Sequence, residues 1–335
     1  PFPVMASVML VCRRCLVGSL RKGLANATKN NTANRLNHSE WKNTNAVFIT
    51  KTEIYRSSST ISAERPVVKT TIDEEELRKF ALLSQQWWDE QGEFEALHAL
   101  NQLRIPFVRD GLLNQRGIPP LDITQPLAGF SVLDVGSGGG LLAEPLARLG
   151  AFVVGIDAVE ENIKIAQIHL QQDHKIAGKV KYIETTVEDM LVTEEENFDA
   201  VVLSEVAEHV TDLAHFIESC CRLVKPGGSV FITTLNKTQA SYFLGVLMAE
   251  RVLHLLPAGT HNWNKFIPPE DLQYLLDKNG CVTRLVHGMC YNFLGKKWSW
   301  IQNTSINYAV HAVKIDSTKS WTTSESKFKN DSSST

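Results

Sequence analysis

The chain has 335 residues, of which 43% are hydrophobic, and a formal net charge of −3 at pH 7. This length and composition are sufficient for one large globular domain with a sizeable core. The slightly acidic balance argues against nucleic-acid binding, which normally needs a basic face, so no nucleic-acid partner is expected.

The first 39 residues contain no Asp or Glu, but they carry several Arg and Lys residues among small and hydroxyl-bearing side chains. This composition is typical of a mitochondrial transit peptide. A plain disordered tail is the alternative. A secretory signal fits less well, because Arg13 and Arg14 interrupt the apolar stretch 8–20. We expect a transit peptide and disordered leader over residues 1–68 and a disordered tail over residues 316–335.

Ordered structure is predicted to begin at Thr71. Thr71 and Glu74 match a capping box, and apolar residues recur at helical spacing from Leu77 to Trp88. We therefore expect an N-terminal helical extension ahead of the main domain. The following stretch 111–126 contains several Gly and Pro residues and is predicted to be a loop.

From Phe130 onward, short apolar runs alternate with helical stretches. Strands are predicted at 131–135, 152–156, 180–183, 198–203, 230–234, 281–286 and 308–313. Helices are predicted at 141–149, at 159–170 and in the stretch that ends at Val224. This alternation favours a mostly parallel sheet with helices on both faces. The sequence thus predicts an α/β, doubly wound, Rossmann-like domain over residues 69–315.

A glycine-rich loop follows the first predicted strand, with glycines at 136, 138, 139 and 140. Glycine permits positive φ angles and close approach of the backbone to a ligand, and open α/β sheets bind ligands at the carboxyl ends of their strands. Asp157 ends the second strand, where an acidic side chain can accept hydrogen bonds from both ribose hydroxyls of an adenosine cofactor. A turn or helix-start role is the alternative for Asp157.

These features would also suit a dinucleotide-dependent dehydrogenase, and the spacing separates the two classes. The dinucleotide fingerprint requires Gly or Ala at the position that Leu141 occupies here. Asp134, two residues before the loop, is typical of the loop that binds S-adenosylmethionine. The sequence therefore favours a class I methyltransferase fold with S-adenosylmethionine as its cofactor.

Several short segments between residues 72 and 314 resemble the ubiquinone biosynthesis O-methyltransferase family. These segments are Trp87–Phe94, Asn101–Arg104, 132–140, Ser204–Val210, Leu223–Gly228, Thr234–Asn236 and Gly259–Trp263. Two positions depart from the family pattern. Ser137 replaces a Cys in a loop that acts through its backbone, and Ala207 replaces a larger apolar residue.

The resemblance implies cofactor contacts at Arg104, Gly136, Asp157 and Ser204. Arg104 would form a bidentate pair with the methionine carboxylate of the cofactor. Its alternative role is that of an ordinary surface arginine on a helix. Ser204 would contact the cofactor through its backbone.

The resemblance also implies a divalent metal at Glu205, Glu208 and His209. Their spacing places all three on one face if the segment is helical, and two carboxylates with an imidazole can bind a divalent ion. Mg²⁺ is expected, although a histidine ligand also suits Mn²⁺, Co²⁺ or Zn²⁺. An exposed acidic helix start is the alternative. His261 is a candidate catalytic base, or else a structural histidine.

The function implied by the resemblance is metal-assisted O-methylation of polyprenyl-dihydroxybenzoate and demethylubiquinol. The enzyme would lie peripherally on the matrix side of the mitochondrial inner membrane, in a multi-subunit ubiquinone-biosynthesis complex. Within the methyltransferase domain, residues 239–265 would form a membrane- or substrate-facing insertion, because Tyr242–Pro257 is mostly apolar. An ordinary core or lid helix is the alternative for this stretch. The rival functions are methylation of another small molecule, such as a different phenol, and a non-catalytic scaffold subunit that binds the cofactor.

Overall fold

The computed structural model describes residues 69–117, 119–238, 241, 265–292 and 294–316. All of them lie in the second of the two units into which the chain divides, Lys69–Thr335. The expected leader, nearly all of the expected tail and most of the 239–265 insertion, including His261, lie outside the described residues. Those expectations therefore stay predictions.

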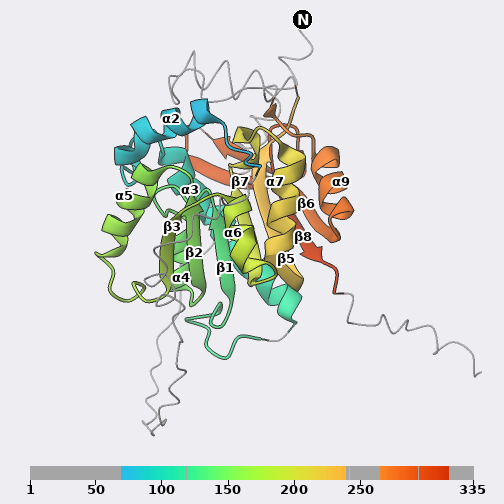
Figure 1. Cartoon of the computed structure of the whole chain (residues 1–335), viewed down its shortest axis with the longest axis horizontal. Coiled ribbons are helices and arrows are strands. Elements are labelled where there is room, and N and C mark those ends of the chain that lie inside the picture. The colour runs from blue at the N-terminus through green and yellow to red at the C-terminus, as the bar shows by residue number, and fades with distance from the viewer. Residues whose placement is uncertain (1–68, 118, 239–240, 242–264, 293, 317–335) are drawn as a thin grey trace, which may run out of the picture. The chain divides into compact units, whose positions relative to one another are not determined.

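One eight-stranded sheet organises the domain, in the order β3-β2-β1-β4-β5-β8-β6-β7 (Figure 1). Strands β1 to β5 run parallel to one another. Strand β8 runs antiparallel to β5 and β6, and β7 runs antiparallel to β6. The mostly parallel, doubly wound sheet predicted from the sequence is thus confirmed. The strands are β1 (Ser131–Val135), β2 (Phe152–Asp157), β3 (Val180–Glu184), β4 (Phe198–Ser204), β5 (Val224–Leu235), β6 (Cys281–Asn292), β7 (Lys297–Ile301) and β8 (Asn307–Lys314).

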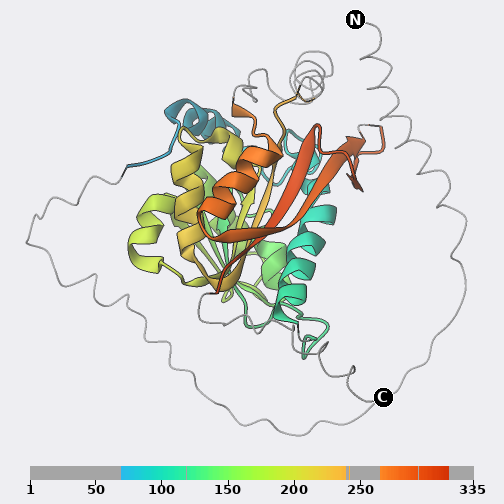
Figure 2. The same ribbon diagram turned by 90° about the vertical axis from the view of Figure 1, so that its right-hand side faces the viewer.

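Helices bury both faces of the sheet because successive strand residues point to opposite sides. In β1, Leu133 and Val135 pack with α6 (Val187–Glu194), α7 (Leu213–Leu223) and α9 (Pro269–Lys278). Val132 packs on the other side with α3 (Glu95–Arg116), α4 (Ala143–Arg148) and α5 (Glu160–Leu170). In Figure 2 the antiparallel strands lie toward the viewer, with α9 and α3 on opposite sides of them. None of the described helices combines the length and apolarity needed to cross a bilayer.

An N-terminal extension, residues 69–116, precedes the sheet. It contains α2 (Glu74–Leu83), the short 3₁₀ helix η2 (Ser84–Gln86) and α3. The extension was predicted, but its capping box was wrong. Asp73 caps α2 by accepting hydrogen bonds from the backbone N–H groups of Glu75 and Glu76. The side chain of Thr71 instead donates to Glu188, 2.6 Å away.

The predicted loop at 111–126 is wrong in its first six residues, because α3 continues to Arg116 and ends at a left-handed Gly117. Gly111 lies inside the helix, where a Cβ atom would approach the ring of Phe231 on β5 to 2.4 Å. The glycine therefore permits close helix–sheet packing and does not mark a turn. Helices α6 and α9 and strand β7 are further elements that the sequence patterns did not predict.

Candidate functional site

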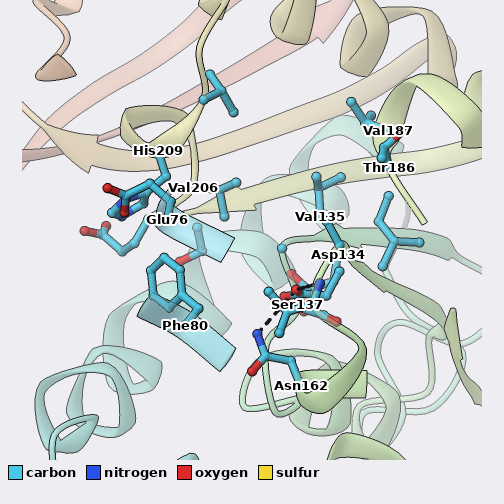
Figure 3. A pocket seen from close by; sticks show the side chains of 18 of the residues that line it. Glu76, Phe80, Asp134, Val135, Ser137, Asn162, Thr186, Val187, Val206 and His209 are labelled. Atoms are coloured by element: carbon cyan, nitrogen blue, oxygen red, sulfur yellow. Dashed lines mark hydrogen bonds and ion pairs between the residues drawn. The ribbon is translucent and has the colours of Figure 1, made fainter. Parts of the chain in front are cut away.

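A pocket lies at the carboxyl ends of β1, β2 and β4, where a doubly wound sheet is expected to bind its ligand (Figure 3). We call it the strand-end pocket. The sheet contributes residues from the ends of these strands and the loops after them, and the N-terminal extension covers it. Its lining includes Thr71, Glu76, Phe80, Trp87, Arg104, Asp134, Gly136, Ser137, Asp157, Asn162, Thr186, Ser204, Glu205, Val206 and His209.

The glycine loop forms one wall of the pocket. Gly136 and Gly138 have φ angles of +67° and +53°, which strongly favour glycine. A Cβ atom at Gly138 would also lie only 2.4 Å from the indole ring of Trp87. Both the conformation and the packing therefore require glycine here. The positive φ angles agree with the prediction, and the close neighbour that the structure shows is Trp87.

Asp157 lies where predicted, at the end of β2 and on the pocket wall. One carboxylate oxygen accepts a hydrogen bond from the backbone N–H of Gly138 at 2.9 Å. The other accepts from the backbone N–H of Val159 at 2.8 Å and from the side chain of Asn162 at 3.3 Å. Burial raises the pKa of Asp157, and these hydrogen bonds act against that shift. Asp157 thus makes the helix-start contact proposed as its alternative and lines the pocket as well.

Arg104 is not a surface arginine, because only 5% of it is exposed. Its guanidinium donates to the Oγ atom of Ser204 at 2.9 Å and to the Oδ1 atom of Asn101 at 2.6 Å. Two candidate cofactor residues separated by 100 positions thus meet in the pocket. The side chain of Ser204 also shares a hydrogen bond with Thr233. The predicted backbone contact of Ser204 with the cofactor stays a prediction.

The charge of Arg104 is surrounded by acidic groups. Burial lowers its pKa to about 10, while nearby Asp134 and Glu205 act against that shift, so the guanidinium stays charged at neutral pH. Burial also raises the pKa of Asp134 to about 7. The Oδ2 atom of Asp134 is buried without a hydrogen-bond partner in the described structure. Arg104 is thus a buried cation in the lining of the pocket, and it can pair with an anionic group of a ligand.

The segment after β4 is not the helix assumed for the metal site, and that expectation is wrong. Glu205 adopts a left-handed conformation with φ +57°, and only Ala207–His209 form a single 3₁₀ turn. The left-handed residue turns the chain and directs Val206 against the glycine loop, where its Cγ2 atom would lie 2.5 Å from a Cβ atom on Gly136. The three candidate ligands therefore do not share a helical face.

Glu208 and His209 point to different partners. Glu208 is buried, and its Oε2 atom accepts a hydrogen bond from Thr234 at 2.7 Å. The Nδ1 atom of His209 lies 2.9 Å from the Oε2 atom of Glu76, and its ring packs edge-on against Phe80. Figure 3 shows Glu76 and His209 side by side. Glu76 was not predicted, because only the folded chain brings α2 beside this turn.

The acidic pair Glu205 and Glu208 is electrostatically costly. Burial and then the charge of Glu205 raise the pKa of Glu208 to about 8, and its Oε1 atom is buried without a hydrogen-bond partner. The two carboxylates fit a divalent cation, because a bound cation would neutralise the repulsion between them. The Nδ1 atom of His209 contacts Glu76, so only its Nε2 atom could ligate a metal ion. Among the described residues, no three His, Cys, Asp or Glu side chains gather closely enough to hold a metal ion.

Residues 69–76 form a strap that ties the extension to the rest of the domain. Two of its charged residues form ion pairs with distant residues. Lys69 pairs with Asp212, and Asp73 pairs with Lys265. Between them, the carbonyl oxygen of Thr71 accepts hydrogen bonds from the backbone and side chain of Thr211. The strap and α2 thus complete the pocket wall opposite the glycine loop.

Comparison with known proteins adds to this geometry. Residues 133–232 match the family model described as "Methyltransferase domain". The chain is 50% identical over 246 residues to the human mitochondrial ubiquinone biosynthesis O-methyltransferase, spanning 73% of this chain and 66% of that protein, just under two thirds. It is 41% identical to the ubiquinone biosynthesis O-methyltransferase of Methylobacterium sp. (strain 4-46), covering 73% of this chain and 96% of that protein.

Among solved structures, the magnesium protoporphyrin IX methyltransferase of Synechocystis PCC 6803 aligns with a TM-score of 0.48 at 20% identity, covering 72% of this chain and 93% of that one. The family match and the high identity to named relatives agree with the resemblance noted in the sequence. The chain therefore belongs to the ubiquinone biosynthesis O-methyltransferase family of class I methyltransferases, whose cofactor is S-adenosylmethionine.

Proposed function

We propose that this chain transfers a methyl group from S-adenosylmethionine to phenolic hydroxyls of polyprenylated ubiquinone precursors, namely polyprenyl-dihydroxybenzoate and demethylubiquinol. One observation carries the proposal. In a chain 41–50% identical to named O-methyltransferases, the strand-end pocket is lined by the buried cation Arg104 and by Glu205, which acts on Arg104 and on the buried Glu208 beside it. Arg104 suits the cofactor carboxylate, and the acidic pair suits the acceptor side of the reaction.

Methyl transfer from a sulfonium to oxygen is an in-line displacement, so the pocket has to fix the angle between the cofactor and the acceptor. Arg104, Gly136 and Asp157 would hold and orient the cofactor. The neutral phenol is a poor nucleophile, with an unperturbed pKa of about 10 by analogy with tyrosine. Loss of its proton is therefore the second requirement of the reaction.

We further propose that Glu205 and Glu208 hold a divalent cation, with Mg²⁺ expected. When bound, such an ion favours the phenolate form of the acceptor. His209 would join as a third ligand through its Nε2 atom, with Nδ1 kept on Glu76. His261, outside the described residues, remains a candidate base.

The test is a methylation assay on a short-prenyl dihydroxybenzoate, with and without a chelator, combined with calorimetric titration of Mg²⁺ and S-adenosylhomocysteine. The proposal expects turnover that the chelator abolishes and measurable Mg²⁺ binding. Cofactor binding without turnover on any phenol supports the scaffold alternative. Turnover of a simple catechol but not of the prenylated benzoate supports a different phenol as substrate.

We also propose a location peripheral to the matrix side of the mitochondrial inner membrane, within a multi-subunit ubiquinone-biosynthesis complex. The leader composition, the mitochondrial names of relatives and the apolar stretch Tyr242–Pro257 support this location. Replacing Leu247 and Leu255 with Glu should weaken liposome binding without lowering the melting temperature. A lower melting temperature with unchanged liposome binding would indicate a core helix.

A further inference from the structure

The N-terminal extension supplies an aromatic residue that lies directly against the glycine loop. Trp87 is 7% exposed, and its ring stacks on Phe94 with a centroid distance of 3.9 Å and an interplanar angle of 2°. On the other side, the indole occupies the space that a Cβ atom would need at Gly138 and Gly139. The indole is therefore fixed between its own extension and the cofactor loop.

The polar edge of this indole begins a hydrogen-bond chain. The Nε1 atom of Trp87 donates to the Oδ1 atom of Asn162 at 2.8 Å, and the Nδ2 atom of Asn162 donates to the Oδ1 atom of Asp157 at 3.3 Å. An indole N–H can only donate and a carboxylate can only accept, so these two partners determine the orientation of the amide. Asn162 is 1% exposed, so little water can compete for these bonds.

This series of hydrogen bonds ends at the carboxylate of Asp157, the group expected to bind the ribose. The second carboxylate oxygen of Asp157 accepts from the backbone N–H of Gly138, the same residue that packs against Trp87. Trp87 thus acts on the loop by contact and on the carboxylate through Asn162. Trp87, Asn162 and Asp157 all line the strand-end pocket.

We propose that Trp87 is a positioning residue for the cofactor: through Asn162 it holds the Asp157 carboxylate in the orientation that accepts the ribose hydroxyls. The inference rests on the proposed function only in taking Asp157 as the ribose acceptor. The ordering of the cofactor site then depends on a residue 75 positions before Asn162, in a segment outside the sheet.

The experiment measures S-adenosylhomocysteine binding by calorimetry for Trp87→Phe, which keeps an aromatic ring and removes the donor. Loss of one net hydrogen bond should raise Kd about three- to tenfold. The KM for S-adenosylmethionine should rise similarly while kcat stays within about twofold, because the reacting groups are untouched. Trp298→Phe is the matched control, since its indole donates to the carbonyl oxygen of Ala96, away from Asp157. Its Kd should equal that of the wild type.

Two further measurements separate positioning from a general loss of stability. Asn162→Leu should weaken binding by a similar factor, and the Trp87→Phe/Asn162→Leu double variant should bind no more weakly than the weaker single variant. Against the 2′-deoxyribose analogue of S-adenosylhomocysteine, the loss caused by Trp87→Phe should shrink. Wild-type affinity in both single variants, or an equal loss against the analogue, would overturn the inference. Failure of the wild type to bind S-adenosylhomocysteine would instead refute the cofactor assignment itself.

Discussion

Asp157 on the cofactor side of the site and Glu208 on its proposed acceptor side are buried carboxylates with different hydrogen bonding. On the cofactor side, Asp157 accepts three hydrogen bonds from Gly138, Val159 and Asn162. On the acceptor side, Glu208 keeps one buried oxygen without a hydrogen bond and lies near a second acid, Glu205. The chain itself thus satisfies Asp157, whereas Glu208 retains a repulsion that a proton or a divalent cation would relieve.

Backbone geometry follows the same division. The positive φ angles on the cofactor side fall on glycines, which adopt them without steric cost. On the acceptor side a positive φ falls on Glu205, where a side chain makes it unfavourable by about 1–3 kcal/mol. Strain and unrelieved charge thus coincide at one turn, which is typical of residues kept for function.

The strongest test of this contrast is Glu208→Ala. If the acceptor side holds a catalytic cation, turnover should fall by roughly a hundredfold or more, because a first ligand is lost. The Kd for S-adenosylhomocysteine should stay within about twofold, because the cofactor side is untouched. Initial rates measured against free Mg²⁺ concentration, with calorimetry in parallel, give both numbers. Full wild-type activity in excess chelator would contradict the metal role and make His261 the next residue to test.

Removal of the buried charge of Arg104 should affect cofactor binding instead. Arg104→Met should raise the Kd for S-adenosylhomocysteine by about a hundredfold, since a buried charged donor is lost. Arg109→Met is the matched control on the same helix, because Arg109 pairs with Asp110 near the surface. If the two variants bind equally well, Arg104 does not contact the cofactor.

Asp157→Ala should weaken cofactor binding by about 1–3 kcal/mol, because the ribose hydroxyls lose a charged acceptor. The variant should also disturb the glycine loop, since the backbone N–H of Gly138 loses its partner. Calorimetry on a variant shown to be folded by circular dichroism gives the measurement. An unchanged affinity would remove Asp157 from the cofactor site.

The smallest expected effect concerns a buried histidine outside the pocket. His311 on β8 contacts Ser229 and stacks on Phe231, and burial lowers its pKa to about 4 from the ordinary 6.5. The unfolded chain therefore takes up the proton first, and stability is lost as the pH falls from 6.5 toward 4.

Between pH 7 and pH 5, the wild type should accordingly lose about 2 kcal/mol more unfolding free energy than His311→Gln. Urea titrations at both pH values provide the comparison. Equal losses would show that His311 does not titrate as the fold implies. A larger loss in the wild type would show that buried polar groups also lower the unfolding free energy outside the pocket.

The parallel strands β1 to β4 could be predicted closely from sequence, because each is a mostly buried apolar run, whereas β5 begins six residues before its predicted start, at Val224. The observed β1 matches its prediction, and β2 and β4 each extend one residue beyond theirs. Prediction failed where a residue serves tertiary packing. Gly111 resembles a turn residue in isolation, and only the ring of Phe231 explains it.

The position of the pocket could also be predicted from the strand ends, but the tertiary contacts within it could not. Gly136 and Asp157 follow from the position of strand ends, and the family resemblance supplied Arg104 and Ser204, which meet in the pocket. The left-handed turn at Glu205 has no local signal, since glutamate rarely adopts it. The contacts of Glu76 and Trp87 join segments far apart in the chain, and periodicity carries no information about them.

The strap of residues 69–76 has a consequence for the order of folding. Its ion pairs join Lys69 to Asp212 and Asp73 to Lys265, separations of 143 and 192 residues. Contacts of such long range carry a high loop-closure entropy and cannot form until most of the domain has left the ribosome. The strap is therefore synthesised long before its partners, and the nascent chain completes this part of the pocket only after Lys265 has been synthesised.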